Sequence, residues 1–123
     1  MKYSESLKKN KDFQNVYKNG TSQANRYLLM YVLRNQYKKN RLGISVSKKV
    51  GNSVVRHRVT RLIREGYRLN ETLFLEGLDI VVIARTSIKD KSYQEVEKAL
   101  IHAAERCRIR KIRGNDNDEE IPD

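Results

Sequence analysis

The sequence is poor in cysteine and histidine and has no long apolar run, and each shortage excludes a class of protein. Cys107 is the single cysteine among 123 residues, which excludes an internal disulfide framework and zinc sites built on several cysteines. No apolar run approaches the ~18 to 20 residues that cross a bilayer. The opening stretch, MKYSESLKKNK, lacks the apolar segment of a secretory signal. We therefore expect a soluble, cytoplasmic protein.

Acidic residues are scarce in the first half of the chain. The sequence has 26 lysines and arginines against 15 aspartates and glutamates, for a net charge of +11. Residues 1–68 hold 17 of the basic residues and only three acids, and residues 106–113 are basic again. Residues 114–123, GNDNDEEIPD, are acidic and poor in apolar side chains, so we expect a disordered tail after a single domain at 1–113. The basic charge predicts a polyanionic partner, most commonly a nucleic acid.

Hydrophobic periodicity predicts the elements of the first half. Residues 10–19 place apolar side chains on one face of a short helix, and Asn10 is its expected cap. Residues 26–34 are almost continuously apolar, which is typical of a buried strand. Residues 41–47 alternate between apolar and polar, and the short connection favours an antiparallel hairpin of these two strands.

The second half is expected to contain two helices and a central strand. A glycine-containing turn precedes a helix at about 54–67, with Asn52 or Ser53 as its cap. Residues 78–85 are nearly all apolar and predict a central strand, and a capping-box sequence begins the last helix near residue 92. The order α-β-β-α-β-α predicts an α+β fold with helices packed on a small mixed sheet. The core stripe of the helix at 54–67 is expected at Val55, Val59, Leu62, Ile63 and Tyr67.

The side of this helix opposite the core stripe carries charge of one sign. Like charges at helical spacing repel each other, so such a face is favourable where phosphates neutralise it. Arginine also binds phosphate in a bidentate manner. We interpret the face as a nucleic-acid contact, extended by Lys48 and Lys49 before the helix; an ordinary solvated face is the alternative. The face comprises Arg56, His57, Arg58, Arg61, Arg64 and Arg68.

Three aromatic residues form the second candidate surface. Phe13 and Tyr17 lie on the first helix and Tyr31 on the first long strand, so the three rings could line a groove between helix and sheet. Rings of this kind stack on unpaired bases at ~1 to 3 kcal/mol each. The alternative is that they fill the core, the commoner place for aromatic residues at helical spacing.

A catalytic set is not recognisable in the sequence. A nuclease would need paired carboxylates to hold metal ions, or a pair of histidines for acid–base chemistry. Glu5, Asp12 and Glu65 show no spacing typical of a metal cluster, and His57 and His102 each stand alone. We therefore expect a chain that binds RNA without cleaving it and without holding a metal ion of its own.

Two stretches resemble the protein subunit of bacterial ribonuclease P. They are KKNKDFQNVYKNGTSQANRYLLMYVL and RLGISVSKKVGNSVVRHRVTRLIRE, and the similarity extends over most of residues 7–106. The resemblance implies an α+β fold with a left-handed βαβ crossover, an arrangement shared with a ribosomal protein domain. It also implies a role in tRNA 5′ maturation as part of an endoribonuclease whose catalytic centre and magnesium ions belong to the RNA subunit. A ribosomal or other structural RNA-binding protein remains the alternative.

The resemblance also implies partners and site residues. The partners are the catalytic RNA and the single-stranded 5′ leader of precursor tRNA, with no obligate protein partner and no membrane. His57 stands where the family commonly has asparagine, and Thr60 where it commonly has lysine, so a role that needs the asparagine amide is in doubt. Arg56, Arg58, Arg61 and Arg64 match the family's arginine-rich signature that faces the RNA subunit. To this RNA-subunit surface we add His57, Arg68 and Lys48 from the charged face of the helix. The residues implied for the leader are Phe13, Tyr17, Tyr31, Lys49 and Arg85.

Overall fold

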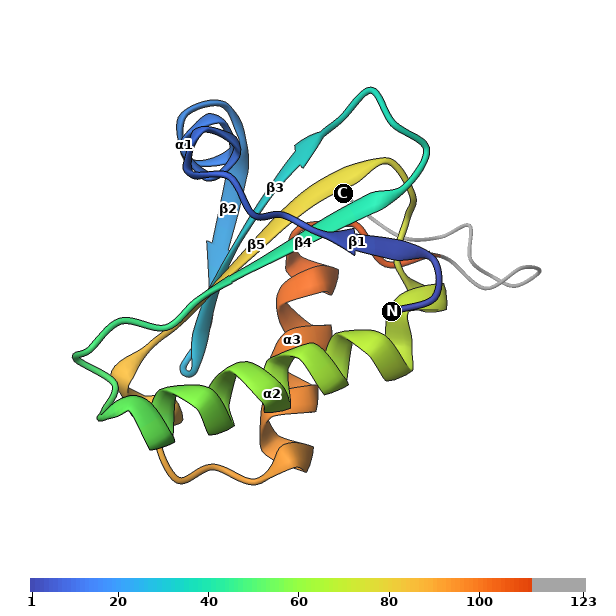
Figure 1. Ribbon diagram of the computed structural model, residues 1–123. Coiled ribbons are helices and arrows are strands. Elements are labelled where there is room, and N and C mark those ends of the chain that lie inside the picture. The colour runs from blue at the N-terminus through green and yellow to red at the C-terminus, as the bar shows by residue number, and fades with distance from the viewer. Residues whose placement is uncertain (112–123) are drawn as a thin grey trace.

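The computed structural model describes residues 1–111, which form a five-stranded sheet with helices on both faces (Figure 1). The predicted α+β class is confirmed, whereas the predicted order omitted two short strands. The expected domain end at residue 113 and the expected tail at 114–123 lie outside the described residues. No helix within residues 1–111 is long and apolar enough to span a membrane. The elements are β1 (Ser4–Ser6), α1 (Asn10–Asn19), β2 (Thr21–Ala24), β3 (Leu28–Arg34), β4 (Asn40–Ser45), α2 (Ser53–Asn70), the 3₁₀ turn η1 (Glu71–Leu73), β5 (Leu78–Ala84), the 3₁₀ turn η2 (Thr86–Ile88) and α3 (Tyr93–Arg106).

The strand order in the sheet is β1-β4-β5-β3-β2. β5 lies in the middle, antiparallel to β3 and parallel to β4, which confirms the predicted central strand. The predicted hairpin of residues 26–34 and 41–47 is wrong, because β5 lies between the two strands. β5 is buried along most of its length and therefore requires a partner on each edge. The hairpin partner of β3 is the short strand β2.

The connection from β4 through α2 to β5 is a crossover between adjacent parallel strands. In Figure 1, β4 lies nearer the viewer than β5, both strands run toward the left, and α2 returns beneath the sheet. This path is left-handed, as the resemblance implied, whereas nearly all βαβ connections are right-handed. The turn of residues 46–52 joins the end of β4 directly to the start of α2.

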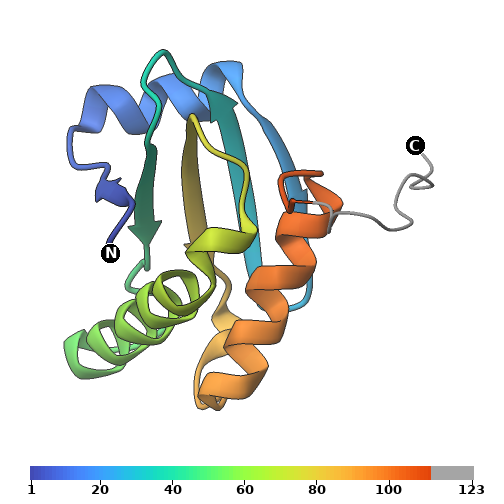
Figure 2. The ribbon, with the colours of Figure 1, turned by 90° about the vertical axis from the view of Figure 1, so that its right-hand side faces the viewer.

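Helices cover both faces of the sheet (Figure 2), with a large hydrophobic core on one face and a small one on the other. α2 and α3 pack on one face over the large core, and α1 packs on β3 and β5 on the other face. The alternation of β3 follows this division: Met30 is fully buried in the large core, whereas Tyr31 faces α1. The small core beneath α1 contains the buried side chains of Leu7, Val16 and Val81.

Side-chain caps fix the starts of α2 and α3. The Asn52 side chain accepts a hydrogen bond from the Val55 backbone N–H at 3.0 Å. Ser92 and Glu95 form the predicted capping box in reciprocal hydrogen bonds. Because α2 begins at a fixed residue, its helical phase is fixed as well, and the charged and apolar sides are set relative to the sheet.

The predicted apolar stripe of α2 faces the core: Val59, Ile63 and Tyr67 are fully buried. Val55 and Leu62 pack against the core and are only partly buried. The predicted cap of α1 is wrong. Asn10 is the first helical residue, and Lys9 occupies the cap position without a side-chain hydrogen bond to the helix. α1 is therefore held by the contacts of its buried Val16 and its aromatic side chains with the sheet rather than by a polar cap.

The N-terminal segment is attached to the end of α2 by one buried carboxylate. Glu71 accepts hydrogen bonds from the backbone N–H groups of Lys2 and Tyr3 at 2.8 and 2.9 Å and from the Ser4 hydroxyl at 2.8 Å. Burial alone would raise the pKa of Glu71, but these hydrogen bonds outweigh it and hold the pKa below its usual value. The Ser4 hydroxyl also bonds the Tyr67 hydroxyl at 2.7 Å. This network holds β1 against β4 although β1 has only three residues.

Candidate nucleic-acid interface

The charged side of α2 faces solvent and carries unbalanced positive charge. Arg61, Arg64 and His57 are exposed, and within residues 1–111 none of them forms an ion pair or a side-chain hydrogen bond. The nearest acid, Glu65, is already bound by Arg68 through two hydrogen bonds of 3.0 and 2.7 Å. The surface, called the arginine face below, comprises Arg56, His57, Arg58, Arg61, Arg64 and Arg68.

Two arginines of this face are oriented by main-chain carbonyl groups. Arg58 donates to the Lys91 carbonyl oxygen at 2.9 Å, and Arg56 reaches the Gly51 carbonyl oxygen at 3.5 Å. These contacts leave the guanidinium charge without a counterion while limiting its motion. The Thr60 hydroxyl donates to the Arg56 carbonyl oxygen at 2.9 Å, so it turns back to the helix and adds no charge.

The arginine face is hollowed rather than flat. A groove of about 630 Å³ runs along α2 and reaches the N-terminal methionine. Lys48 and Lys49 are exposed in the turn that leads from β4 into α2, so they lie beyond the N-terminal end of this helix. The groove is lined by Met1, Arg58, Arg61, Leu62, Arg64, Glu65 and Arg68.

The three predicted aromatic residues come together on the opposite face of the sheet. The Phe13 and Tyr17 rings have centroids 6.3 Å apart, and the Tyr17 and Tyr31 rings meet edge to face at 5.1 Å. All three are half-buried: they pack against the small core and leave part of each ring accessible. Burial, reinforced by Tyr31, raises the pKa of the Tyr17 hydroxyl, while a hydrogen bond with Ser45 opposes the shift. We call this group the aromatic cleft.

A glycine forms the floor of the aromatic cleft. Gly43 of β4 pairs with Val81 of β5, which pairs with Tyr31 of β3, so these residues form one row across the sheet. A Cβ atom on Gly43 would lie 2.6 Å from the Cζ atom of Phe13, a distance that no packed ring tolerates. The next row on this face, toward the end of β4, contains Ser45, which pairs with Ile83 of β5. The absent side chain therefore allows the Phe13 ring to lie against the sheet.

Two basic residues lie at one end of the sheet. β4 and β5 are parallel, so Lys49, which follows β4, and Arg85, which follows β5, lie beyond the same ends of their strands. Side chains alternate along a strand, which places Arg85 on the same face as Val81. Its Nη1 atom donates to the Asn25 carbonyl oxygen at 2.9 Å, and the side chain is exposed. A single-stranded nucleic acid lying in the aromatic cleft would therefore meet the positive charge of these two side chains at this end of the sheet.

The predicted residues thus form two surfaces on opposite faces of one sheet, joined by the turn that carries Lys48 and Lys49. Gly43 and Ser45 belong to the cleft and were missed from the sequence. The alternation of the segment RLGISVS places both on one face, but nothing in the sequence showed which helix would cover it.

The chemistry of these surfaces is that of binding. Within residues 1–111 the structure brings together no group of three or more His, Cys, Asp or Glu side chains that could hold a metal ion. Cys107 packs against the core, and burial raises the pKa of its thiol to about 11, so the thiol is protonated at neutral pH. The two surfaces present guanidinium groups, ammonium groups and aromatic rings, which suit phosphates and unpaired bases.

Comparison with known proteins places the chain among relatives of one kind. The family described as Ribonuclease P matches residues 1–108. The chain is 61% identical over 106 residues to the ribonuclease P protein component of Lachnoclostridium phytofermentans, which covers 86% of this chain and 91% of that protein. It is 49% identical to the protein component of Alkaliphilus metalliredigens, over 89% of this chain and 98% of that protein.

Solved structures show the same similarity. The RNase P protein of Staphylococcus aureus superposes with a TM-score of 0.80 at 40% identity, covering 86% of this chain and 97% of that chain. The RNase P protein of Thermotoga maritima superposes with a TM-score of 0.77 at 31% identity, covering 83% and 96% of the two chains.

Proposed function

The chain belongs to the Ribonuclease P family, whose protein components take part in tRNA processing by binding RNA. From that membership we propose that the two faces of the sheet bind two different RNAs. The arginine face binds the catalytic RNA of a ribonuclease P holoenzyme. The aromatic cleft binds the single-stranded 5′ leader of precursor tRNA. Cleavage takes place on the RNA subunit, and the holoenzyme acts in the cytoplasm.

The single observation that carries the first assignment is the unbalanced charge of Arg61 and Arg64. Both are exposed and without an ion pair in residues 1–111, and the one acid nearby is bound by Arg68. Phosphates of a folded RNA would supply the missing negative charge and release their own counterions. Arg56 and Arg58, held by carbonyl groups, add charge in a fixed direction. The full set is Arg56, His57, Arg58, Arg61, Arg64, Arg68 and Lys48.

The second assignment rests on the geometry of the cleft. A single strand is recognised where bases can stack on partly exposed rings while its phosphates meet basic side chains. Phe13, Tyr17 and Tyr31 supply the rings, and Lys49 and Arg85 supply charge at the end of the sheet. Mature tRNA has no leader, so the cleft favours the precursor.

Magnesium belongs to the RNA in this proposal, where it supports hydrolysis of the leader. The described residues of the chain offer no cluster of three metal ligands, and His57 is exposed among arginines. The part of the protein is to bind, to orient the precursor and to neutralise phosphates, so that RNA strands approach each other at lower magnesium concentration.

A reconstitution experiment tests the proposal. The purified protein is mixed with ribonuclease P RNA and a precursor tRNA at low magnesium, and leader release is measured. We expect cleavage by the mixture and none by the protein alone. Cleavage by the protein alone would assign catalysis to the chain, and an RNA whose activity the protein does not change would favour a structural RNA-binding role.

The arginine face is tested separately by the salt dependence of binding. Arg61→Ala/Arg64→Ala should give a shallower slope of log affinity against log salt for the RNA subunit. Lys98→Ala/Arg106→Ala, which removes two exposed charges of α3, is the matched control and should leave the slope unchanged. Equal slopes for all three proteins would show that the arginine face is only solvated.

A further inference from the structure

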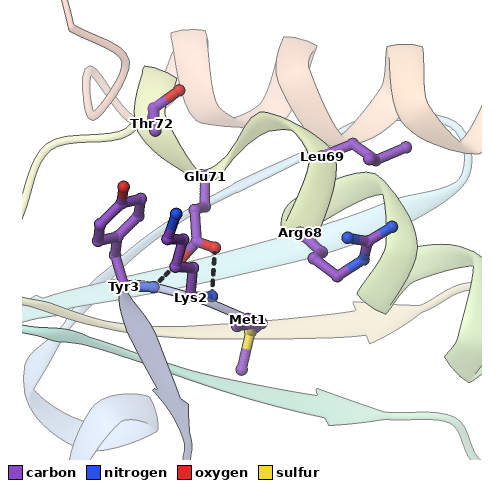
Figure 3. Close-up of a pocket in the computed structure, with 7 residues that line it drawn as sticks. All are labelled: Met1, Lys2, Tyr3, Arg68, Leu69, Glu71 and Thr72. Atoms are coloured by element: carbon purple, nitrogen blue, oxygen red, sulfur yellow. Dashed lines mark hydrogen bonds between the residues drawn. The ribbon is translucent and has the colours of Figure 1, made fainter.

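The groove on the arginine face continues around the N-terminal segment. It shares Met1 and Arg68 with a second groove of about 420 Å³ at the end of α2, shown in Figure 3. That groove shares Lys2 and Tyr3 with a third one of about 300 Å³, which reaches the connection between β3 and β4. Three hollows with common walls therefore form one path from α2 past β1.

Glu71 holds the middle of this path in place without leaving free negative charge. Figure 3 shows its carboxylate bonded to the backbone nitrogens of Lys2 and Tyr3. The Ser4 hydroxyl donates a third hydrogen bond to the same carboxylate. Since its oxygens are occupied by the chain itself, Glu71 acts as an anchor, and the side chains of Lys2 and Tyr3 project from an immobilised backbone.

The far end of the path is basic. Lys38 and Lys39 are exposed in the connection between β3 and β4, and both line the third groove. Lys39 lies 3.6 Å from Glu5, but both side chains are more than half exposed, and such pairs contribute little. Lys38 has no ion pair within residues 1–111. Lys111 also lines this groove, 3.8 Å from the exposed Glu76.

Aromatic rings accompany these lysines. Tyr3 is 55% exposed and Tyr37 is 58% exposed, values that are high for large side chains of a folded domain. The Tyr37 ring lies against the guanidinium of Arg41 at 4.8 Å, which fixes the plane of the ring and leaves one side open. Basic groups together with open rings match a backbone of phosphates with unpaired bases.

We propose that Lys2, Lys38 and Lys39, with Tyr3 and Tyr37, form a second contact for the RNA that the arginine face binds. The inference rests on the proposed function, because the path is continuous with the arginine face and extends the same positive charge. The RNA backbone follows the grooves from Arg61 and Arg64 across the N-terminal segment to Lys38. The recognised chemistry is phosphate, and the source is the RNA subunit rather than the leader, because the grooves lined by Lys2 and Lys38 are continuous with the groove of the arginine face.

The test compares three double variants of the full chain. Binding of the RNA subunit is measured at several salt concentrations for Lys38→Ala/Lys39→Ala, for Arg61→Ala/Arg64→Ala and for the control Lys98→Ala/Arg106→Ala. All substituted side chains are exposed, so folding is preserved. We expect the slope of log affinity against log salt to become shallower by about 1.5 for the lysine variant, because each lost phosphate contact removes about 0.7 to 0.9.

The outcomes separate the inference from the proposed function. A shallower slope for the arginine variant alone overturns the second contact and leaves the proposed function standing. Unchanged slopes for both the lysine and the arginine variants overturn both. The third outcome concerns the assembled holoenzyme. If Lys38→Ala/Lys39→Ala weakens binding of leader-bearing precursor but leaves binding of the RNA subunit unchanged, the lysines contact the leader and the proposal is overturned.

Discussion

Gly43→Ala tests how the fold shapes the aromatic cleft. The new Cβ atom would lie 2.6 and 2.7 Å from two carbon atoms of the Phe13 ring and 3.3 Å from the Leu7 Cβ atom. Gly43 is not among the described residues with positive φ, so alanine fits its backbone conformation. The destabilising part of the effect therefore comes from the collision, and the ring of Phe13 must leave its place against the sheet.

The magnitude follows from two opposing contributions. Overpacking a well-filled site costs about 1 to 3 kcal/mol, whereas replacing glycine by alanine within a strand returns about 0.5 to 1 kcal/mol. Phe13 is half-buried and swings outward at less cost than a fully buried ring. We expect a net loss of about 1 kcal/mol in the free energy of unfolding, which lowers Tm by roughly 4 °C in a domain of this size.

A double-mutant cycle with Phe13→Ala supplies the decisive measurement. Unfolding free energies are obtained from urea denaturation, and precursor affinity is measured with the holoenzyme. In the Phe13→Ala background the second substitution meets no ring, so Gly43→Ala should then cost little or even stabilise. Additive losses, with no coupling between the two positions, would refute the view that Gly43 exists to admit this ring. A precursor affinity that Gly43→Ala leaves unchanged would instead show that the displaced ring does not contact the leader.

Three further predictions concern single residues. Phe13→Ala should weaken binding of precursor tRNA by about 1 kcal/mol or more and leave the affinity for mature tRNA unchanged. Equal losses of affinity for both ligands in a binding assay would refute the assignment of the leader to the cleft. The lowered pKa of Glu71 means that its contribution to stability is complete above the unfolded pKa of about 4.3 and is lost as the pH falls through the folded value. Glu71→Gln should therefore flatten the acid limb of the stability profile, and an unchanged limb in acid denaturation would contradict the anchor. Asn52→Ala should cost about 1 kcal/mol, because the Asn52 side chain caps α2. Asn10→Ala, whose side chain forms no cap hydrogen bond at the start of α1, should cost little, and similar losses for both in thermal unfolding would contradict the assigned caps.

Local patterns were sufficient for the helices and for the central strand. The burial of Val59, Ile63 and Tyr67 followed from their helical spacing, because one helix side must face the core. The Ser92–Glu95 capping box also depends only on residues three positions apart. Such features are decided within one element, so a single sequence contains the information.

The arrangement of the strands could not be predicted in this way. The short connection between β3 and β4 favoured a hairpin, and only the late strand β5, which lies between them, excludes it. β1 and β2 have the polar sequences SES and TSQA, which lack any apolar alternation. β1 is held by Glu71, more than sixty positions away, and pairings of this range leave no local pattern.

The candidate site was predictable in kind but not in detail. The one-signed face of α2 follows from residue spacing, yet the structure shows that Arg68 is bound to Glu65, a pairing that the three-residue spacing allowed. The closeness of Phe13 to Gly43 joins two distant segments and appears only when α1 is placed on the sheet. Whether each surface holds the RNA assigned to it stays a prediction.

The central place of β5 has a consequence for how the protein is made. β5 begins at Leu78, so β3, β4 and α2 all leave the ribosome before β5, the strand that lies between β3 and β4 in the sheet. At about 5 to 20 residues per second, the basic first half spends several seconds without the sheet that supports both surfaces. RNA that meets the growing chain in that interval encounters basic side chains that are not yet arranged into folded binding surfaces. Selective recognition begins only when β5 is synthesised and completes the sheet.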